Sequence, residues 1–304
     1  MFIADAHADT LYARAIQGHA PELCAVTPDR MNQVGSLLMT FALFTGRNAK
    51  DSTAYQDALM MMAQLDNLGV PIIKGRLPDE KPNVPTGILS VEGGEMFEGN
   101  IERLYEFHNQ ARIRMIALTW NYENEIGHPA KNGPTPGLKP FGRELIEEMD
   151  KLGIVVDVSH LNEAGFYDAI ELSKLPVIAS HSNYRPLCEH VRNLTKDQVE
   201  QIINKRGFIG INFYSAFLAS GRLAKIDDVL RHAEAILALG GEDVLGFGSD
   251  FDGIDEWPEW LGEPSQFPRL VDLLLQQNYA EALVEKIAGG NLWRVLKDAE
   301  RTAL

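Results

Sequence analysis

Basic residues are scarce in this sequence. Lys and Arg together number 28 against 43 Asp and Glu residues, which gives the 304-residue chain a formal net charge of −15. No run of basic residues is present to meet phosphate groups, so the composition argues against nucleic acid or an anionic membrane surface as a partner.

Long apolar runs and cysteine motifs are also lacking. No apolar stretch approaches the roughly 20 residues needed to span a bilayer. Asp5, His7 and Asp9 interrupt the N-terminal stretch, which therefore does not have the form of a signal peptide. The two cysteines, Cys24 and Cys188, do not have the spacing of a metal site. We therefore expect two reduced thiols, no membrane partner and a cytoplasmic location.

What the sequence has is an alternation of short apolar runs with amphipathic stretches. The runs cover residues 2–7, 37–44, 87–94, 114–120, 154–160, 176–182, 208–214 and 244–250. Helices are expected between them, for example at 53–69, 141–153 and 195–207. The last of these opens with Thr195 and has Gln198 three residues later, which is a capping-box pattern.

Eight apolar strands alternating with helices predict a (β/α)8 TIM-type barrel that forms a single domain over residues 1–304. An open, doubly wound sheet is the alternative fold. It is disfavoured because no glycine-rich phosphate fingerprint follows the first strand.

Residues that bind metals stand at the carboxyl ends of these runs, where the active site of such a barrel lies. They are His7, Asp9, Glu92, His160, His181 and Asp250. Three histidines and several carboxylates at one mouth would suit Zn²⁺. A single Asp after a strand is more often a helix N-cap, which would account for Asp157 and Asp252. The remaining histidines, His19, His108, His128, His190 and His232, are expected to be structural.

The first run, "FIADAH", raises the question of how its polar residues are directed. Side chains alternate along a strand, so His7 and Asp9 can both point to the barrel axis. Asp5 has the same parity but lies deeper, and we expect it to support a ligand from behind.

The chain resembles the membrane (renal) dipeptidase family. The resemblance rests on "DAHADT", "SVEGG", "LTWN", "GIVVDVSH", "PVIASHS", "RN", "GINFY" and "GSDFDG", which follow one another in the family's order. It implies that His7 and Asp9 hold one zinc, that Glu92 bridges two, and that His160 and His181 hold the second. Asp250 matches the family's catalytic carboxylate, and Arg192 the arginine that holds the substrate's carboxylate. The family hydrolyses dipeptides, often accepts a D-residue at the C-terminal position, and tends to form homodimers.

One departure from the family pattern is Trp120, which stands where the animal members have a histidine that polarises the reaction intermediate. Indole donates a single N–H and carries no charge, so stabilisation of the oxyanion would fall to the metals, with help from Asn121 or Tyr122. We also place Trp120, Asn121 and Tyr214 in the substrate site. The Gly- and Pro-rich segment 121–138 is expected to form a wall or lid over it.

Three alternative functions are considered. A related amidohydrolase would act on another amide or on a cyclic amide. A metal-free barrel enzyme would need a Schiff-base lysine or a phosphate site, and neither is found at the strand ends. An inactive binding scaffold is disfavoured because the ligand set is complete.

Overall fold

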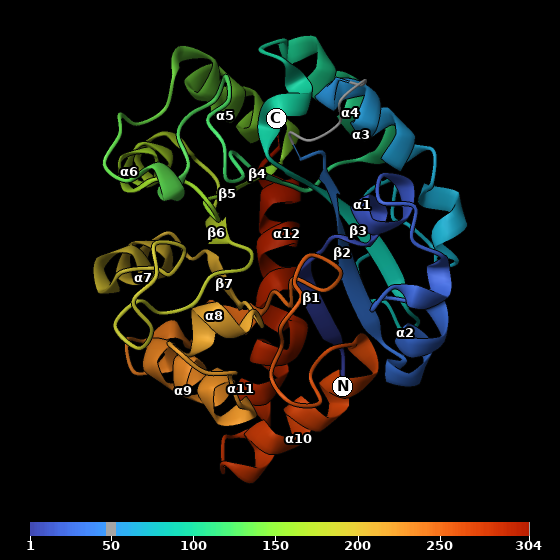
Figure 1. Ribbon diagram of the computed structural model, residues 1–304, viewed down its shortest axis with the longest axis vertical. Coiled ribbons are helices and arrows are strands. Elements are labelled where there is room, and N and C mark those ends of the chain that lie inside the picture. The colour runs from blue at the N-terminus through green and yellow to red at the C-terminus, as the bar shows by residue number, and fades with distance from the viewer. Residues whose placement is uncertain (47–52, 304) are drawn as a thin grey trace.

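Eight parallel strands form a closed barrel in the computed structural model, which describes residues 1–46 and 53–303 (Figure 1). Each strand pairs with the next along the chain, and β8 pairs with β1. The strands are β1 Ile3–Ala8, β2 Leu37–Phe44, β3 Thr86–Glu92, β4 Met115–Ala117, β5 Val155–Asp157, β6 Val177–Ala179, β7 Phe208–Ile211 and β8 Leu245–Phe247. The predicted (β/α)8 barrel is therefore confirmed, although β4, β5, β6, β7 and β8 are shorter than the apolar runs that predict them.

Helices connect the strands and surround them (Figure 1). The α-helices are α1 Thr10–Ala15, α2 Pro28–Val34, α3 Ala54–Met62, α4 Ile101–Ala111, α5 Pro140–Leu152, α6 Glu163–Leu172, α7 Lys196–Asn204, α8 Ser215–Leu218, α9 Ile226–Leu237, α10 Phe267–Gln276, α11 Glu281–Glu285 and α12 Asn291–Thr302. A π-helical turn, Lys286–Gly290, joins α11 to α12. Short 3₁₀ turns lie at Pro21–Leu23, Leu65–Leu68, Gly94–Phe97, Ala130–Asn132, Gly241–Asp243 and Pro264–Gln266.

Helix boundaries follow local chemistry. Thr195 and Gln198 form the expected capping box at the start of α7. Helix α5 begins at Pro140, whose missing N–H costs nothing in the first turn, and ends before Gly153, which adopts φ +69°. The predicted helix 53–69 is divided, because α3 ends at Met62 and a separate 3₁₀ turn follows.

The apolar core has two layers. An outer layer packs the strands against the surrounding helices. An inner cluster fills the barrel and contains Ala4, Ala6 and Phe208 together with Leu292 and Leu296 of α12. Helix α12 therefore covers the N-terminal end of the barrel, and Figure 1 shows it running across the centre of the ring of strands. The opposite, carboxyl-terminal end is left for the polar residues.

None of the helices within residues 1–46 and 53–303 has both the length and the apolar character needed to cross a bilayer.

Candidate active site

A one-residue bulge in β1 brings His7 to the barrel mouth. Three residue steps of β1, from Asp5 to Ala8, run beside two of β2, from Met39 to Phe41. Ala4 and Ala6 belong to the inner cluster, whereas Ala8 packs in the outer layer. The extra residue reverses the faces after Ala6, so the expectation that Asp5 shares the face of His7 is wrong. His7 and Asp9 do lie on the same side, as expected, with Nε2 of His7 3.4 Å from Oδ2 of Asp9. Asp5 does give support from behind: its Oδ1 accepts N–H bonds from His7 (3.4 Å) and Ser249 (2.8 Å).

His160 and His181 face Glu92 from the turns that follow the neighbouring strands β5 and β6. The Nε2 atom of His160 lies 2.9 Å from Oε1 of Glu92, and that of His181 lies 3.5 Å from the same oxygen. The two Nε2 atoms are 3.0 Å apart. His160 has φ +68°, a conformation that is uncommon for a residue with a side chain and that tends to occur at functional sites.

The other oxygen of Glu92 belongs to a second group. Its Oε2 lies 3.4 Å from Nε2 of His7, and that nitrogen lies 3.4 Å from Oδ2 of Asp9 and 3.8 Å from Oδ1 of Asp250. Asp250, like His160, has a positive φ, +67°. Glu92 thus directs one oxygen into each of two adjoining groups of ligand atoms.

The donor set fits divalent cations. Ligands bound tetrahedrally to one zinc at about 2.0–2.1 Å lie roughly 3.3 Å from each other, close to the separations measured here. The buried atoms Nε2 of His7 and Oδ1 of Asp9 have no hydrogen-bond partner in the part of the chain that the structure describes. A Cβ at Gly253 would lie 2.1 Å from Oδ2 of Asp9, so this glycine keeps space open beside the cluster. Nitrogen and carboxylate oxygen donors together are typical of zinc.

The electrostatics of the site also favour a bound cation. Burial raises the pKa of Asp9 to about 7 and also raises that of Asp250. Burial alone would lower the pKa of His7, but the charges of Glu92 and Asp9 hold it well above its ordinary value. Burial opposes ionisation of Glu92, but the charge of His7 and the hydrogen bond from His160 hold its pKa well below its usual range. Burial and the negative charge of Glu92 thus make Asp9 and Asp250 harder to ionise, and a bound cation would relieve this repulsion.

Arg192 lies buried beside the cluster without an acidic partner. Its Nη1 is 3.5 Å from Oγ of Ser182 and its Nη2 is 3.4 Å from the carbonyl oxygen of His181. The Nε atom has no hydrogen-bond partner, and no ion pair to Arg192 occurs within the described parts of the chain. Burial lowers the pKa of this guanidinium to about 10, although Asp250 and Glu92 partly offset the effect. A buried guanidinium with spare donors is suited to receive a carboxylate.

Two cavities meet at His160. One, of about 510 Å³, is the mouth over the cluster, and its lining includes Trp120, Asn121 and Tyr214. The Trp120 ring packs 4.8 Å from that of Phe44, centre to centre. Asn121 contacts the cluster directly, because its Oδ1 lies 3.1 Å from Nδ1 of His160.

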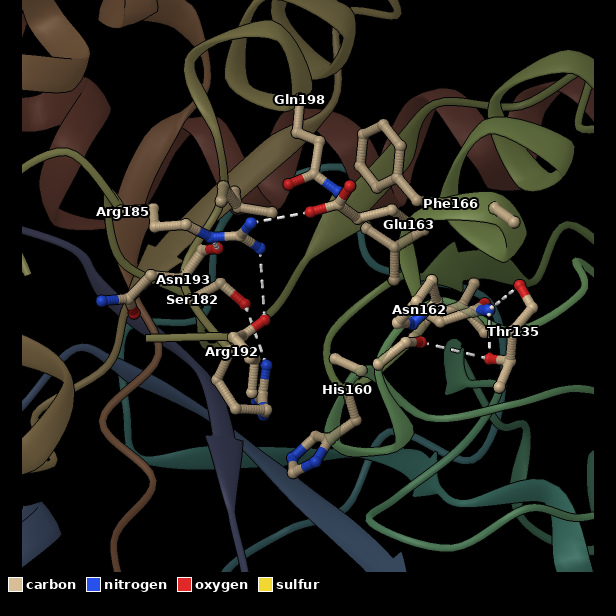
Figure 2. A pocket seen from close by; sticks show the side chains of 18 residues that line it. Thr135, His160, Asn162, Glu163, Phe166, Ser182, Arg185, Arg192, Asn193 and Gln198 are labelled. Atoms are coloured by element: carbon tan, nitrogen blue, oxygen red, sulfur yellow. Dashed lines mark hydrogen bonds and ion pairs between the residues drawn. The ribbon is translucent and has the colours of Figure 1, made fainter. Parts of the chain in front are cut away.

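The second cavity, of about 410 Å³, opens on the other side of His160 and reaches Arg192. Figure 2 shows His160 and Arg192 at one end of it and the ion pair of Arg185 with Glu163 (2.7 Å) at the other. Four residues of the segment expected to form a wall contribute to its lining: Ala130, Gly133, Pro134 and Thr135. Asn162 fixes that segment, because its Nδ2 donates to the carbonyl oxygen of Thr135 over 3.0 Å.

The sequence did not point to Asn212 or Ser180 as site residues. Asn212 donates from Nδ2 to Oδ2 of Asp250, and Ser180 contacts both His181 and Asp157. The signal was in the quoted stretches "GINFY" and "ASHS", where Asn212 lies two residues before Tyr214 and Ser180 directly before His181.

The interpretation of Asp157 and Asp252 as helix N-caps is wrong. The cap of α6 is Asn162, and Asp157 bonds instead to Ser180 of the neighbouring strand. Asp252 accepts a hydrogen bond from Oγ1 of Thr10 and from the N–H of Ala25, and so ties β8 to the loop after α1.

Comparison with known proteins gives consistent matches. The family described as "Membrane dipeptidase (Peptidase family M19)" matches residues 1–304. An uncharacterized dipeptidase of Schizosaccharomyces pombe is 35% identical over 224 residues, which are 71% of this chain but only 53% of that protein, so the match spans about half of its length.

Solved structures agree over almost the whole chain. The metallopeptidase of Rhodobacter sphaeroides, liganded with a phosphinate mimic of the dipeptide L-Ala-D-Ala, has a TM-score of 0.85 and 25% identity, covering 98% of this chain and 99% of that one. The dipeptidase AC, a metallopeptidase, has a TM-score of 0.86 and 27% identity, covering 98% of both chains.

Proposed function

Because the chain belongs to the membrane dipeptidase family, we propose that it is a zinc-dependent dipeptidase. In this proposal the cluster at the barrel mouth would hold two Zn²⁺ ions, and Glu92 would be a ligand shared by both. His7 and Asp9 complete one site, and His160 and His181 the other. Asp250 is the catalytic carboxylate.

One observation carries the proposal. Glu92 contributes one oxygen to each of two groups of ligand atoms, and next to them lies the buried Arg192, which makes no ion pair with any residue that the structure describes. A site that joins cation ligands to a free guanidinium is suited to a substrate with an amide bond close to a terminal carboxylate.

The chemistry assigned to the protein side chains is proton transfer and positioning. Zinc, when bound, lowers the pKa of a coordinated water towards about 7 and polarises a carbonyl group. Asp250 accepts the proton that the attacking water loses and returns it to the nitrogen of the leaving amine, so that hydrolysis adds one water across the C–N bond. Trp120 and Tyr214 line the mouth and exclude solvent from the substrate.

Arg192 selects the substrate in this proposal. Its guanidinium would bind the C-terminal carboxylate of a dipeptide, and the 410 Å³ cavity beyond it would receive the C-terminal residue (Figure 2). The Rhodobacter sphaeroides structure, with its mimic of L-Ala-D-Ala, supports the expectation that L-Xaa-D-Xaa dipeptides are accepted. A fixed clamp at one end disfavours longer peptides.

A substrate panel tests this function. Purified, zinc-loaded protein is assayed with L,L and L,D dipeptides, a tripeptide, and a dipeptide whose C-terminus is an amide. We expect kcat/KM to fall by at least tenfold for the amide and the tripeptide. Equal kcat/KM for a dipeptide and its amide would instead indicate a broader amidohydrolase.

Metal content tests the ligand assignment separately. Elemental analysis should find close to two zinc equivalents per chain. His181→Ala should lose mainly one ion, because His7, Asp9 and Glu92 remain for the other. Unchanged zinc content in a double His7→Ala/His181→Ala variant would refute the assignment.

A cytoplasmic homodimer stays a prediction that rests on the family resemblance and on the two cysteines, which are free and buried. Cell fractionation and analytical ultracentrifugation would test it.

A further inference from the structure

Behind His181 lies a chain of buried hydrogen bonds that ends on a carboxylate. The Oγ atom of Ser180 lies 2.7 Å from Nδ1 of His181 and also bonds Oδ2 of Asp157. The other carboxylate oxygen, Oδ1 of Asp157, accepts the backbone N–H bonds of Ser159 (2.9 Å) and Ser180 (3.0 Å). All of these residues are buried.

The direction of this chain follows from its chemistry. A carboxylate only accepts hydrogen bonds, so the single hydroxyl hydrogen of Ser180 points to Asp157. The Ser180 oxygen can then only accept from His181, which requires the proton of the imidazole to be on Nδ1. The Nε2 atom, which faces Glu92 and His160, is left with its lone pair.

We propose that Asp157, acting through Ser180, is a positioning pair that holds His181 in the tautomer able to bind a metal ion through Nε2. The inference rests on the proposed zinc site and adds two residues that touch neither substrate nor metal. Partners of this kind commonly change metal affinity by about 10–100-fold.

The other histidine of the same group has a separate partner. Oδ1 of Asn121 lies 3.1 Å from Nδ1 of His160, so His160 does not depend on Ser180. Loss of the Asp157–Ser180 hydrogen bond should therefore weaken metal binding through His181 alone.

The opposite side of the barrel supplies a matched control. Ser249, at the end of β8, donates its N–H (2.8 Å) and its hydroxyl to buried Asp5 of the neighbouring strand, as Ser180 does to Asp157. Its Oγ lies 3.3 Å from the backbone oxygen of His7 and accepts the N–H of Phe251 (3.2 Å), and no imidazole bonds to it within residues 1–46 and 53–303. Ser249→Ala therefore removes an equivalent strand-to-strand bond without touching a histidine ring.

Three variants separate the possibilities. Ser180→Ala removes the acceptor for His181 and should weaken binding of one zinc equivalent by about 10–100-fold. Ser180→Thr keeps the hydroxyl and should restore most of the affinity. In Asp157→Asn the amide oxygen must face the two backbone N–H groups, so the amide NH₂ donates to Ser180. The Ser180 hydroxyl then donates to Nδ1 of His181, and the direction of both hydrogen bonds is reversed. His181 would then carry its proton on Nε2, and this variant should bind the second ion at least as weakly as Ser180→Ala.

Two measurements test the proposal. Zinc affinity is measured by competition with a chelator, and the tautomer of His181 by nitrogen NMR of histidine-labelled, metal-free protein. We expect the proton on Nδ1 in the wild type and on Nε2 in Asp157→Asn. Wild-type zinc affinity in both Ser180→Ala and Asp157→Asn would overturn the proposal, and so would a His181 proton on Nε2 in Ser249→Ala.

The NMR result also distinguishes this inference from the proposed function. If the wild-type protein bound no zinc, the dipeptidase proposal would fail, yet the tautomer of His181 would still be measurable. A wild-type proton on Nε2 would overturn the positioning role whatever the zinc content.

Discussion

Asn212 donates a hydrogen bond from Nδ2 to Oδ2 of Asp250 over 2.8 Å, which leaves Oδ1 of Asp250 directed towards His7. Asn212 is itself fixed by Asn183, whose Oδ1 accepts its N–H over 2.9 Å. One oxygen of Asp250 is thus engaged and the other faces the ligand cluster. This is the arrangement expected of a carboxylate that must take up a proton at one defined atom.

Asp250→Asn should lower kcat by about 10²–10⁴-fold, because an amide of the same shape cannot accept the proton. Zinc content and the thermal midpoint should stay near the wild-type values. Steady-state kinetics measures kcat, and elemental analysis of the same sample measures the zinc content. Near-normal turnover by a fully zinc-loaded variant would remove Asp250 from the proton transfer.

Arg192→Ala should raise KM for dipeptides and lower kcat as well, because a lost clamp also loosens the position of the scissile bond. The dipeptide amide serves as the internal control, since it lacks the charge that the guanidinium binds. We expect the variant to lose at least tenfold in kcat/KM on the dipeptide and much less on the amide.

Arg192→Lys should recover only part of that loss, because an ammonium group cannot form two parallel hydrogen bonds with a carboxylate. Equal losses on dipeptide and amide in both variants would show that Arg192 supports the fold and does not bind the carboxylate.

Glu300→Ala should lower the free energy of unfolding by about 3–5 kcal/mol, because it leaves the buried Arg114 without its partner. The two side chains are 2.8 Å apart, and Glu300 also accepts the N–H of Leu77 (3.1 Å). The exposed pair Lys74–Asp66, also 2.8 Å, is the matched control, and Asp66→Ala should cost less than about 1 kcal/mol. Urea denaturation measures both. A loss below 1 kcal/mol for Glu300→Ala would show that Arg114 does not depend on Glu300 for its burial.

His232 should make the fold sensitive to acid. Burial lowers the pKa of His232 to about 4, and its Nδ1 accepts the N–H of Tyr184 over 3.0 Å, which requires a neutral ring. The unfolded chain, with a pKa near 6.5, therefore binds more protons than the folded protein between about pH 6.5 and 4. The contribution of neutral His232 to the free energy of unfolding is fully present above about pH 6.5, and it is lost as the pH falls towards 4.

His232→Asn keeps an acceptor for Tyr184 but cannot be protonated in this range. The fall in unfolding free energy between pH 6.5 and 4 should be smaller in the variant by on the order of 2–3 kcal/mol. Urea denaturation of metal-free protein at several pH values tests this, since loss of metal then cannot contribute. Parallel pH profiles of wild type and variant would show that His232 is not the sensitive group.

The barrel was predictable because its strands are buried on both faces and read as apolar runs of similar length. The ligand candidates were predictable because parallel strands bring their carboxyl ends together, which gathers His7, Glu92 and His181 whatever lies between them. The bulge in β1 was not, since it depends on pairing with β2 and leaves the local sequence pattern unchanged. Ser180 and Asn212 were missed for a similar reason, because their roles depend on partners in neighbouring strands or loops.

The extra residue in β1 also has a consequence for protein engineering. Because Ala6 and His7 follow each other but face the same interior, the donor set cannot be copied onto a regular strand by matching side chains position by position. A designer who grafts this centre onto an idealised barrel must carry over the insertion together with the ligands. A strand with the same residues but regular pairing would turn His7 away from the interior and remove it from the cluster.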